Sequence, residues 1–319
     1  MASYHRTLIT GSVAYDVLLG YDGSFADAME EGDIDHLSVS FFAPRYARHH
    51  GGTGANIAWN LRMLGGDPLL VSSVGARDGG AYKALLEERG IDTKYLELVP
   101  KQVTATAIIG TDTSERQIAF FHPGADAHGT WPDLWEDRDD IVCAIISPRD
   151  PVAMMQAAEW CQKTETPYIF DPGQQVIGLG EDELKSCVSH AKGVITNAYE
   201  WDLLSARLNM STEAVMELSG LLIVTQGDKG ATIYTKQKTY VVPVCPAEKV
   251  VNPTGAGDAF RAGLLYGMSR KWDILSSARL GSVMGSLVVG IEGTLLPNID
   301  REAVWARAEE VYGAKEPTA

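Results

Sequence analysis

The chain reads Asn-Pro-Thr-Gly-Ala-Gly-Asp over residues 252–258, and this stretch leads directly into the apolar residues 259–266. Small residues before an apolar run predict a tight turn that opens a helix. The first helical turn offers unpaired backbone N–H groups and the positive end of the helix dipole, so it attracts phosphate. A carboxylate at the same edge, Asp258, suits a base that takes a proton from an attacking hydroxyl. Turn and acid together indicate phosphoryl transfer, although helix capping by Asp258 explains the short motif about equally well.

The composition describes an acidic globular protein of 319 residues, with 45% hydrophobic residues and a formal charge of -15 from 42 acidic and 27 basic side chains. Such a surface repels nucleic acid and anionic membranes, so we expect neither as a partner. Four cysteines without a C-x-x-C pair are typical of reduced thiols, and the N-terminus lacks a signal-peptide pattern. Both observations predict a cytoplasmic protein. The oligomeric state, monomer or homodimer, stays open.

Strand-like and helix-like patterns alternate along the chain. Short apolar runs typical of buried strands lie at residues 7–10, 69–74, 141–146, 168–170, 194–196 and 221–225. Helix-like segments lie at residues 55–64, 81–89, 152–163, 181–190 and 212–218. This alternation predicts an α/β fold with a central, mostly parallel sheet that helices flank on both faces.

Two segments that alternate in polarity interrupt this rhythm and carry few helix signals. They predict a small β-sheet lid, inserted into the large domain, of the kind that excludes water from reactive phosphates. The expected division is a large domain of residues 1–16, 51–93 and 122–313, a lid of residues 17–50 and 94–121, and a loose tail of residues 314–319.

A second glycine-rich site, Gly-Gly-Thr-Gly-Ala-Asn at residues 51–56, enters the helix expected at residues 55–64. Gly51 and Gly52 permit close approach of a ligand to the backbone, and Asn56 can exchange hydrogen bonds with hydroxyls. Asp16 follows the first strand, at the edge where open α/β sheets collect ligands. Its carboxylate can accept from two neighbouring sugar hydroxyls. A tight strand-to-helix connection and a solvated loop acid are the alternatives for these two sites.

Two more polar sites follow later strands. Asn197 and Glu200 lie three residues apart, where they can hold a hydrated Mg²⁺ ion or a phosphate-bound water, or cap a helix, or do both. Gly227 and Gly230 follow Thr225, and they predict either a close approach of a nucleotide to the backbone or a plain hairpin. No G-x-x-x-x-G-K-[ST] motif is present, so the chain is not a P-loop enzyme.

Taken in order, these sites resemble the ribokinase-like (PfkB) family of small-molecule kinases over essentially the whole chain. Further stretches resemble the bacterial adenosine kinase-like branch of that family: residues 37–41, 120–125, 171–175 and 261–267. The resemblance implies an ATP-dependent kinase that phosphorylates the 5′-hydroxyl of a nucleoside, with adenosine as the expected substrate.

The resemblance also implies roles for individual residues. Asp258 would be the base, and the backbone N–H groups of Gly255, Ala256 and Gly257 would form an anion hole. Asp16, Asn56 and the Gly51-Gly52 backbone would hold the ribose, with Ser12 beside them. The remaining expected roles are Asn197 and Glu200 for Mg²⁺ and phosphate, Thr225, Gly227 and Gly230 for ATP, Phe41 and Phe121 for stacking on a base, and Arg116 for reaching the phosphates when the lid closes.

One departure from the family pattern concerns a monovalent cation. Many relatives begin the last motif with Asp-Thr, and that Asp helps to bind the cation, whereas this chain has Asn252-Pro253. Activation by K⁺ is therefore in doubt.

Two alternatives to a nucleoside kinase remain. A sugar kinase for ribose, fructose or a keto-deoxy sugar acid stays open, because the lid carries the cationic run Arg45, Arg48, His49 and His50. A binding protein on the same scaffold is disfavoured by the intact Asp258 motif. A nicotinamide dehydrogenase is excluded, because no G-x-G-x-x-G follows the first strand.

Overall fold

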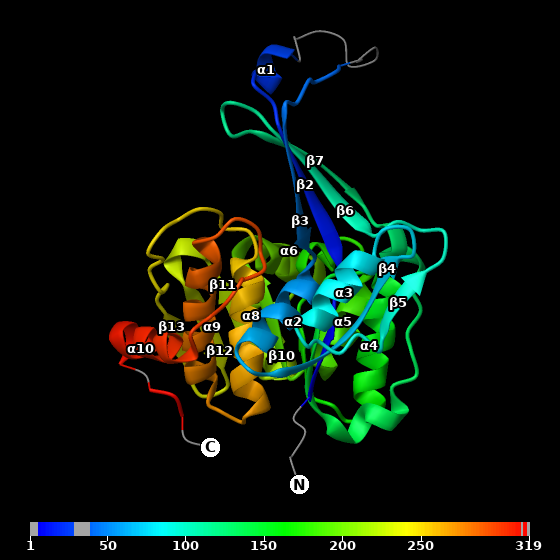
Figure 1. Cartoon of the computed structure of the whole chain (residues 1–319). Coiled ribbons are helices and arrows are strands. Elements are labelled where there is room, and N and C mark those ends of the chain that lie inside the picture. Colours follow the sequence, from blue (N-terminus) through cyan, green and yellow to red (C-terminus); the bar gives the residue numbers. More distant parts are fainter. Residues whose placement is uncertain (1–5, 29–38, 314, 318–319) are drawn as a thin grey trace.

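The computed structural model describes residues 6–28, 39–313 and 315–317, and these residues form two sheets (Figure 1). The expected tail at residues 314–319 and the motif at residues 37–41 lie partly outside the described residues. The strands are β1 (Arg6–Thr10), β2 (Ala14–Gly20), β3 (Arg45–Gly51), β4 (Asp67–Gly75), β5 (Leu96–Val99), β6 (Ala105–Thr111), β7 (Gln117–His122), β8 (Ile141–Ile146), β9 (Tyr168–Phe170), β10 (Gly193–Asn197), β11 (Leu221–Thr225), β12 (Ala231–Thr235) and β13 (Thr239–Val242). The α-helices are α1 (Phe25–Ala28), α2 (Thr53–Met63), α3 (Gly80–Glu88), α4 (Pro151–Lys163), α5 (Glu181–His190), α6 (Ala198–Leu208), α7 (Thr212–Ser219), α8 (Ala256–Ser269), α9 (Ile274–Val289) and α10 (Arg301–Tyr312).

The large sheet has nine strands in the order β13-β12-β11-β10-β9-β8-β1-β4-β5. Its strands from β11 through β1 to β5 pair in parallel, whereas β12 and β13 add an antiparallel hairpin at one edge. Parallel strands buried on both faces favour apolar runs, and β8, which reads Ile-Val-Cys-Ala-Ile-Ile, has one. The strand and helix segments expected from the sequence, and the α/β class, are confirmed.

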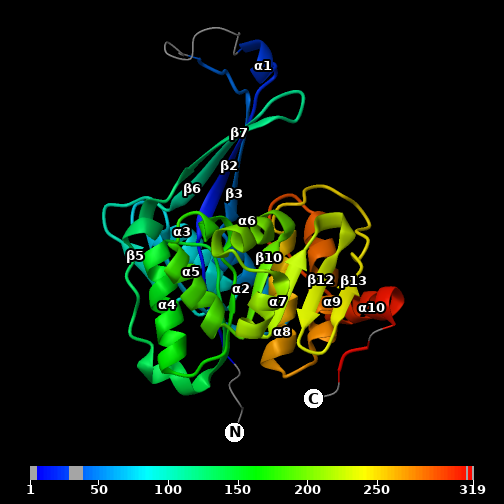
Figure 2. The ribbon, with the colours of Figure 1, turned by 180° about the vertical axis from the view of Figure 1, so that it is seen from behind.

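Helices cover both faces of the large sheet. Helices α2, α3, α8 and α9 lie on the face toward the viewer in Figure 1, and α4, α5, α6 and α7 cover the face shown in Figure 2. Each face has its own hydrophobic core: Leu264 and Met284 belong to one, and Leu184 and Leu204 to the other. The sheet is therefore a rigid platform between two apolar layers, and its strand ends carry the polar residues of the site.

The lid is a four-stranded sheet in the order β3-β2-β6-β7, and it stands above the large sheet in Figure 1. The second lid segment differs from the expected residues 94–121, because β5 pairs in parallel with β4 in the large sheet. Only β6 and β7 of that region join the lid. The predicted lid segment includes residues 94–99 because of their mixed polarity, but β5 is a partly exposed edge strand of the large sheet.

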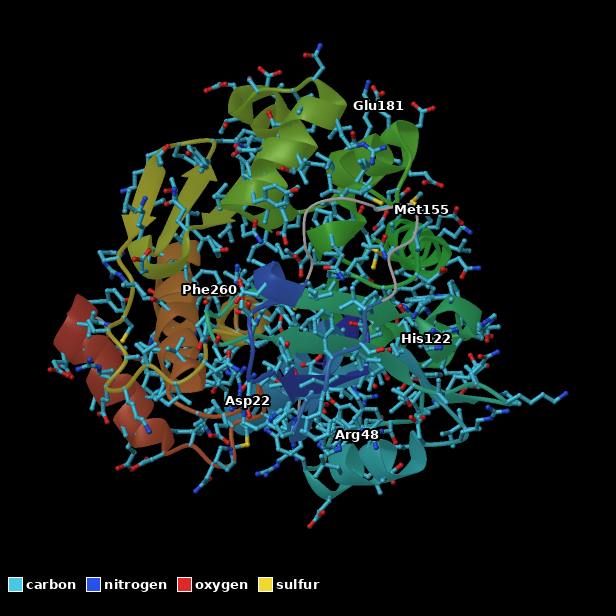
Figure 3. All side chains as sticks on the ribbon, turned by 90° about the horizontal axis from the view of Figure 1, so that it is seen from above. Asp22, Arg48, His122, Met155, Glu181 and Phe260 are labelled. Atoms are coloured by element: carbon cyan, nitrogen blue, oxygen red, sulfur yellow. The ribbon has the colours of Figure 1, made fainter. Side chains whose placement is uncertain are left out.

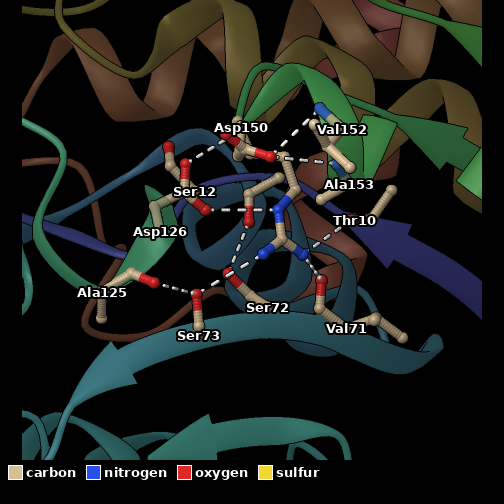
Figure 4. Close-up of polar contacts among 12 residues, drawn as sticks. Thr10, Ser12, Val71, Ser72, Ser73, Ala125, Asp126, Asp150, Val152 and Ala153 are labelled. Atoms are coloured by element: carbon tan, nitrogen blue, oxygen red, sulfur yellow. Dashed lines mark hydrogen bonds and ion pairs between the residues drawn. The ribbon is translucent and has the colours of Figure 1, made fainter. Parts of the chain in front are cut away.

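The connection between β1 and β2 joins the two sheets, and a buried polar network holds it (Figure 4). Ser72 Oγ donates to the carbonyl oxygen of Gly11 at 2.7 Å. The adjacent guanidinium of Arg149 pairs with Asp126 at 3.2 Å and donates to Thr10 Oγ1 and the Val71 carbonyl oxygen. Buried polar groups with this many partners are held in a single arrangement. The start of the lid is thus fixed to the ends of β1 and β4.

Candidate active site

Asp258 lies in the first turn of α8 and is held by a residue more than two hundred positions earlier. Asn56 Nδ2, on α2, donates to Asp258 Oδ2 at 2.7 Å. The amide is oriented by Thr294, whose hydroxyl donates to Asn56 Oδ1 at 2.7 Å and lies 3.1 Å from the His50 carbonyl oxygen. The amide oxygen therefore has its own donor, and its nitrogen is left to the carboxylate. Asn56, expected as a sugar ligand, is first of all the partner of Asp258.

The Asp258 carboxylate is half-buried in an acidic neighbourhood. Burial raises its pKa from 3.8 to about 6, and the charges of Asp171 and Asp16 act in the same direction. The Arg261 guanidinium and the Asn56 hydrogen bond lower the pKa, but they do not outweigh burial. A carboxyl group with a pKa near 6 is ionised at neutral pH and is a stronger base than an ordinary aspartate.

The turn before α8 presents backbone donors. Gly255 has a φ of 82°, and a Cβ there would lie 2.8 Å from Thr294 Cβ, so the position requires glycine. Among the described residues, none accepts a hydrogen bond from the backbone N–H of Gly255, Gly257 or Asp258. The expected anion hole includes the Ala256 N–H. In this structure that N–H instead donates to the Pro253 carbonyl oxygen at 3.2 Å and closes the turn. The free donors are those of Gly255, Gly257 and Asp258.

Two charged residues of the site received no role from the sequence: Arg261 and Asp171. The Arg261 guanidinium forms a two-pronged pair with Asp171, with both N–O distances at 2.6 Å. Asp171 is fully buried, and Arg261 is 7% exposed. Arg261 stands within the apolar residues 259–266, and a charge there signals a buried pair, although the sequence does not indicate which carboxylate is the partner.

Asp16 faces Asp258 from the lid. It lies on β2 opposite His49 of β3, and its charge is close enough to raise the pKa of Asp258. Burial raises the pKa of Asp16 as well. The missing side chain of Gly51 leaves room for the Asp16 carboxylate, because a Cβ there would collide with it. The structure therefore brings Asp16 and Gly51 together at one edge of the site, and their role toward a sugar stays a prediction.

Gly52 and Ser12 hold the start of α2. Gly52 has a φ of 91°, and a Cβ on it would lie 2.6 Å from the Ser12 carbonyl oxygen. The Ser12 hydroxyl accepts from the Thr53 N–H at 3.2 Å, and its carbonyl oxygen accepts from the Gly54 N–H at 2.9 Å. In this structure Ser12 is thus a capping residue for α2, beside the expected sugar position.

A cavity of about 520 Å³ lies on the other side of the α8 N-terminus. Figure 3 looks down on this edge, with Phe260 of α8 between the lid and the hairpin of β12 and β13. Apolar side chains such as Val244, Val250 and Val289 dominate its wall, and the sequence did not single them out. The expected ATP residues Asn197, Thr225, Gly227 and Gly230 all line it, together with Ala256 and Gly257. A mostly apolar cavity of this size with a few polar groups is typical of small-molecule sites, and the role of these residues toward ATP stays a prediction.

Asn197 and Glu200 form a reciprocal capping box at the start of α6. Asn197 Oδ1 accepts from the Glu200 N–H, and Glu200 Oε2 accepts from the Asn197 N–H, both at 2.8 Å. Burial and the nearby Asp171 raise the pKa of Glu200. The described residues contain no cluster of three or more His, Cys, Asp or Glu side chains that could hold a metal. One carboxylate and one amide fit Mg²⁺ only where water and substrate phosphates supply most of the ligands, which is the usual mode for this ion.

The expected lid residues lie apart from this centre. Phe41 packs edge-on against Tyr21 and Phe25 at the lid tip, with ring centroids 5.1 and 4.9 Å apart. Phe121 lies on β7 and is 54% exposed. Arg116 donates through Nε to Asp112 at 2.9 Å and through Nη2 to Ser24 at 2.6 Å, at the tip of the β6–β7 hairpin. Their roles toward a base or phosphate stay predictions.

A helix start with free backbone donors, with a carboxylate and a cavity beside it, fits a small-molecule kinase. Residues 26–301 match the model of the pfkB family of carbohydrate kinases. The chain belongs to this family. It is an ATP-dependent kinase, which transfers a phosphoryl group to an alcohol acceptor.

Relatives and solved structures agree with this assignment. A nucleoside kinase of Methanocaldococcus jannaschii is 31% identical over 267 residues, which cover 83% of this chain and 87% of that protein. The structure of a Burkholderia thailandensis nucleoside kinase in complex with inosine is 33% identical, with a TM-score of 0.85, and covers 97% of this chain and 99% of that chain. The M. jannaschii nucleoside kinase structure is 27% identical, with a TM-score of 0.84 over 97% and 100% of the two chains. The predicted resemblance to nucleoside kinases of this family is confirmed.

The helices in the described ranges lack the combination of length and apolar character that crossing a membrane requires.

Proposed function

We propose that this chain is a nucleoside kinase that transfers the γ-phosphoryl group of ATP to the 5′-hydroxyl of a nucleoside, with adenosine as its expected substrate. The observation that supports the proposal is the hydrogen bond of 2.7 Å from Asn56 Nδ2 to Asp258 Oδ2, because it orients the carboxylate that would act as the catalytic base, with a candidate binding region on either side. The cavity beside α8 lies on one side and the Asp16–Gly51 edge on the other. The B. thailandensis relative, which binds inosine, supports a nucleoside as the acceptor.

The residues of this chain divide the reaction between them. Asp16 and the Gly51 backbone would hold the ribose diol, so that the 5′-hydroxyl reaches Asp258. Asp258 would accept the hydroxyl proton, and Asn56 keeps the carboxylate oriented for this step. The free N–H groups of Gly255, Gly257 and Asp258 would stabilise the charge on the transferred phosphoryl group. Asn197 and Glu200 would hold a hydrated Mg²⁺, which neutralises phosphate charge when it is bound.

The test is a panel of acceptors with MgATP: adenosine, inosine, guanosine, cytidine, uridine, ribose, fructose and a keto-deoxy sugar acid. ADP formation is followed, and the product is identified as the 5′-monophosphate. Asp258→Asn is expected to lower turnover by about 10²- to 10⁴-fold. Asp273→Asn is the matched control, because Asp273 caps α9 away from the site and asparagine caps equally well.

The panel separates the alternatives. Turnover of a free sugar in preference to every nucleoside would make the chain a sugar kinase. Nucleoside binding without ADP formation would favour a binding protein on this scaffold. Turnover of inosine or guanosine above adenosine would keep the nucleoside kinase and replace only its base preference.

A further inference from the structure

The Arg261 side chain, although it belongs to α8, is held in place by residues at the strand ends of the large sheet. Its guanidinium donates to both carboxylate oxygens of Asp171, and Asp171 Oδ2 also accepts a hydrogen bond from Ser147 Oγ at 2.9 Å. Asp171 and Ser147 directly follow β9 and β8. Two-pronged arginine–carboxylate pairs fix both direction and distance, so the guanidinium has one position relative to the strand ends.

The third donor of Arg261 reaches the peptide that carries the anion hole. Arg261 Nη1 donates to the Gly257 carbonyl oxygen at 3.0 Å. That carbonyl belongs to the same planar unit as the Asp258 N–H, which points the opposite way. Fixing the carbonyl therefore fixes the direction of one of the free donors. A cation at the carbonyl also polarises the peptide and strengthens its N–H as a donor.

Gly257 leaves space for this contact. A Cβ at position 257 would lie 3.0 Å from Arg261 Nη1 and within 4 Å of no other atom outside its own helix and neighbours. The residue is part of α8 and has no positive φ, so its backbone does not itself call for glycine. The guanidinium is the neighbour that the missing side chain accommodates.

The charge of Arg261 also acts on Asp258. The charged or titratable groups that face Asp258 come from four elements: Asp16 of β2, Tyr82 of α3, Asp171 after β9 and Arg261 of α8. Arg261 lowers the pKa of Asp258, whereas Asp171 and Asp16 raise it. Removal of the guanidinium alone would therefore leave the carboxylate among uncompensated negative charges.

We propose that Arg261, anchored by Asp171, is a positioning residue for phosphoryl transfer, which directs the Asp258 N–H at the transferred group through the Gly257 carbonyl. The inference rests on the proposed kinase function. It predicts that loss of the guanidinium impairs the chemical step and binding of the γ-phosphate, while nucleoside binding and the adenine end of the nucleotide site are retained.

The test compares Arg261→Met, Arg261→Lys and the double variant Asp171→Asn/Arg261→Met with the wild-type enzyme. Arg6→Met is the matched control, because Arg6 is another arginine paired with carboxylates, Asp92 at 2.5 Å and Asp137 at 3.2 Å, and it lies at the end of β1 remote from the site. Turnover and KM are measured against pH and corrected for the folded fraction from thermal melts. Calorimetry measures the affinities for ADP and for an unreactive ATP analogue.

We expect Arg261→Met to lower kcat by about 10- to 100-fold, with a nucleoside KM within about threefold of wild type. The acid limb of the pH–rate profile of this variant should move to higher pH. Its affinity for the ATP analogue should fall more than its affinity for ADP. Arg261→Lys should restore the position of the acid limb more fully than it restores kcat, because lysine keeps the positive charge but lacks the planar guanidinium that binds two oxygens at once. In the double variant the limb should return toward wild type while kcat stays low. Arg6→Met should lower the stability of the protein and leave its kinetic parameters and ligand affinities unchanged.

Three results would overturn the inference: wild-type kcat in folded Arg261→Met, equal losses of ADP and analogue affinity, or the same pattern in Arg6→Met. Failure of the proposed function looks different. In that case the wild-type enzyme phosphorylates no nucleoside, while the difference between ADP and analogue binding still reports on Arg261.

Discussion

Replacing Asp258 by asparagine is expected to stabilise the protein at neutral pH while it removes the activity. Burial raises the pKa of Asp258 from 3.8 to about 6, so the ionised form is disfavoured in the native state. One pKa unit corresponds to about 1.4 kcal/mol, which gives at most about 3 kcal/mol at pH 7. Because the side chain is only half-buried and water screens part of its charge, we expect a gain of about 1–3 kcal/mol. The asparagine oxygen can still accept from Asn56 Nδ2.

The sign of the pH dependence follows from proton binding. Between about pH 3.8 and 6 the native state binds more protons at this position than the unfolded state does. The stability contributed by Asp258 is therefore full below about 3.8, declines as the pH rises, and is lost above about 6. Asp258→Asn lacks this decline, so its advantage should be largest at pH 7–8 and should shrink toward zero near pH 4.

The assay is urea denaturation of both proteins between pH 4.5 and 8, followed by circular dichroism. Equal or lower stability of the variant at pH 7 would refute the reasoning, as would a gain that does not change with pH. Either result would mean that the carboxylate is well solvated in the native state. The burial that raises the pKa of Asp258 to about 6 would then be absent as a physical cause.

Three further predictions concern the same centre. Turnover at saturating substrate should fall as the pH falls through about 6, to about a tenth of its plateau at pH 5, because Asp258 must be ionised to act as a base; full activity at pH 5 would contradict this. Thr294→Val should lower kcat about tenfold and stability by about 1–2 kcal/mol, since the Asn56 amide loses its orienting donor; an unchanged pH profile and kcat would count against that role. Gly255→Ala should lower stability by about 1–3 kcal/mol and abolish turnover, whereas Gly313→Ala, at a similar φ of 62° with open space around it, should cost less; equal melting temperatures for the two would remove the steric argument.

The sequence was sufficient for the elements of the large sheet and for the position of the phosphate-binding turn. Apolar runs such as β8 and the glycine-rich start of α2 are local signals, and local signals survive without knowledge of the fold. The lid was recognised from alternating polarity. Its second segment was drawn too long, because an edge strand of the large sheet has a similar mixed polarity.

Contacts between residues far apart in the chain could not be predicted from the sequence. Arg261 received no role from the sequence, because several carboxylates could be the partner of a charge in this apolar stretch, and only the packing of α8 against the strand ends selects Asp171. Thr294 lies in a loop without a motif of its own, and its role appears only through Asn56. The Ala256 N–H was assigned to the anion hole because the turn geometry, which gives it to Pro253, is not encoded in a residue pattern.

The separation between Asn56 and Asp258 also bears on how the enzyme becomes active during its synthesis. The two side chains meet across 202 positions, and β1, which lies between β8 and β4 in the large sheet, pairs with β8 from the middle of the chain. A ribosome-bound chain that ends before α8 can assemble β1, β4 and β8, yet it lacks half of the reacting centre. Contacts between residues this far apart in the chain form late, because they require the most loop closure. Recovery of turnover after refolding should therefore lag behind recovery of helical and sheet signal, and it reports the docking of α8 onto α2.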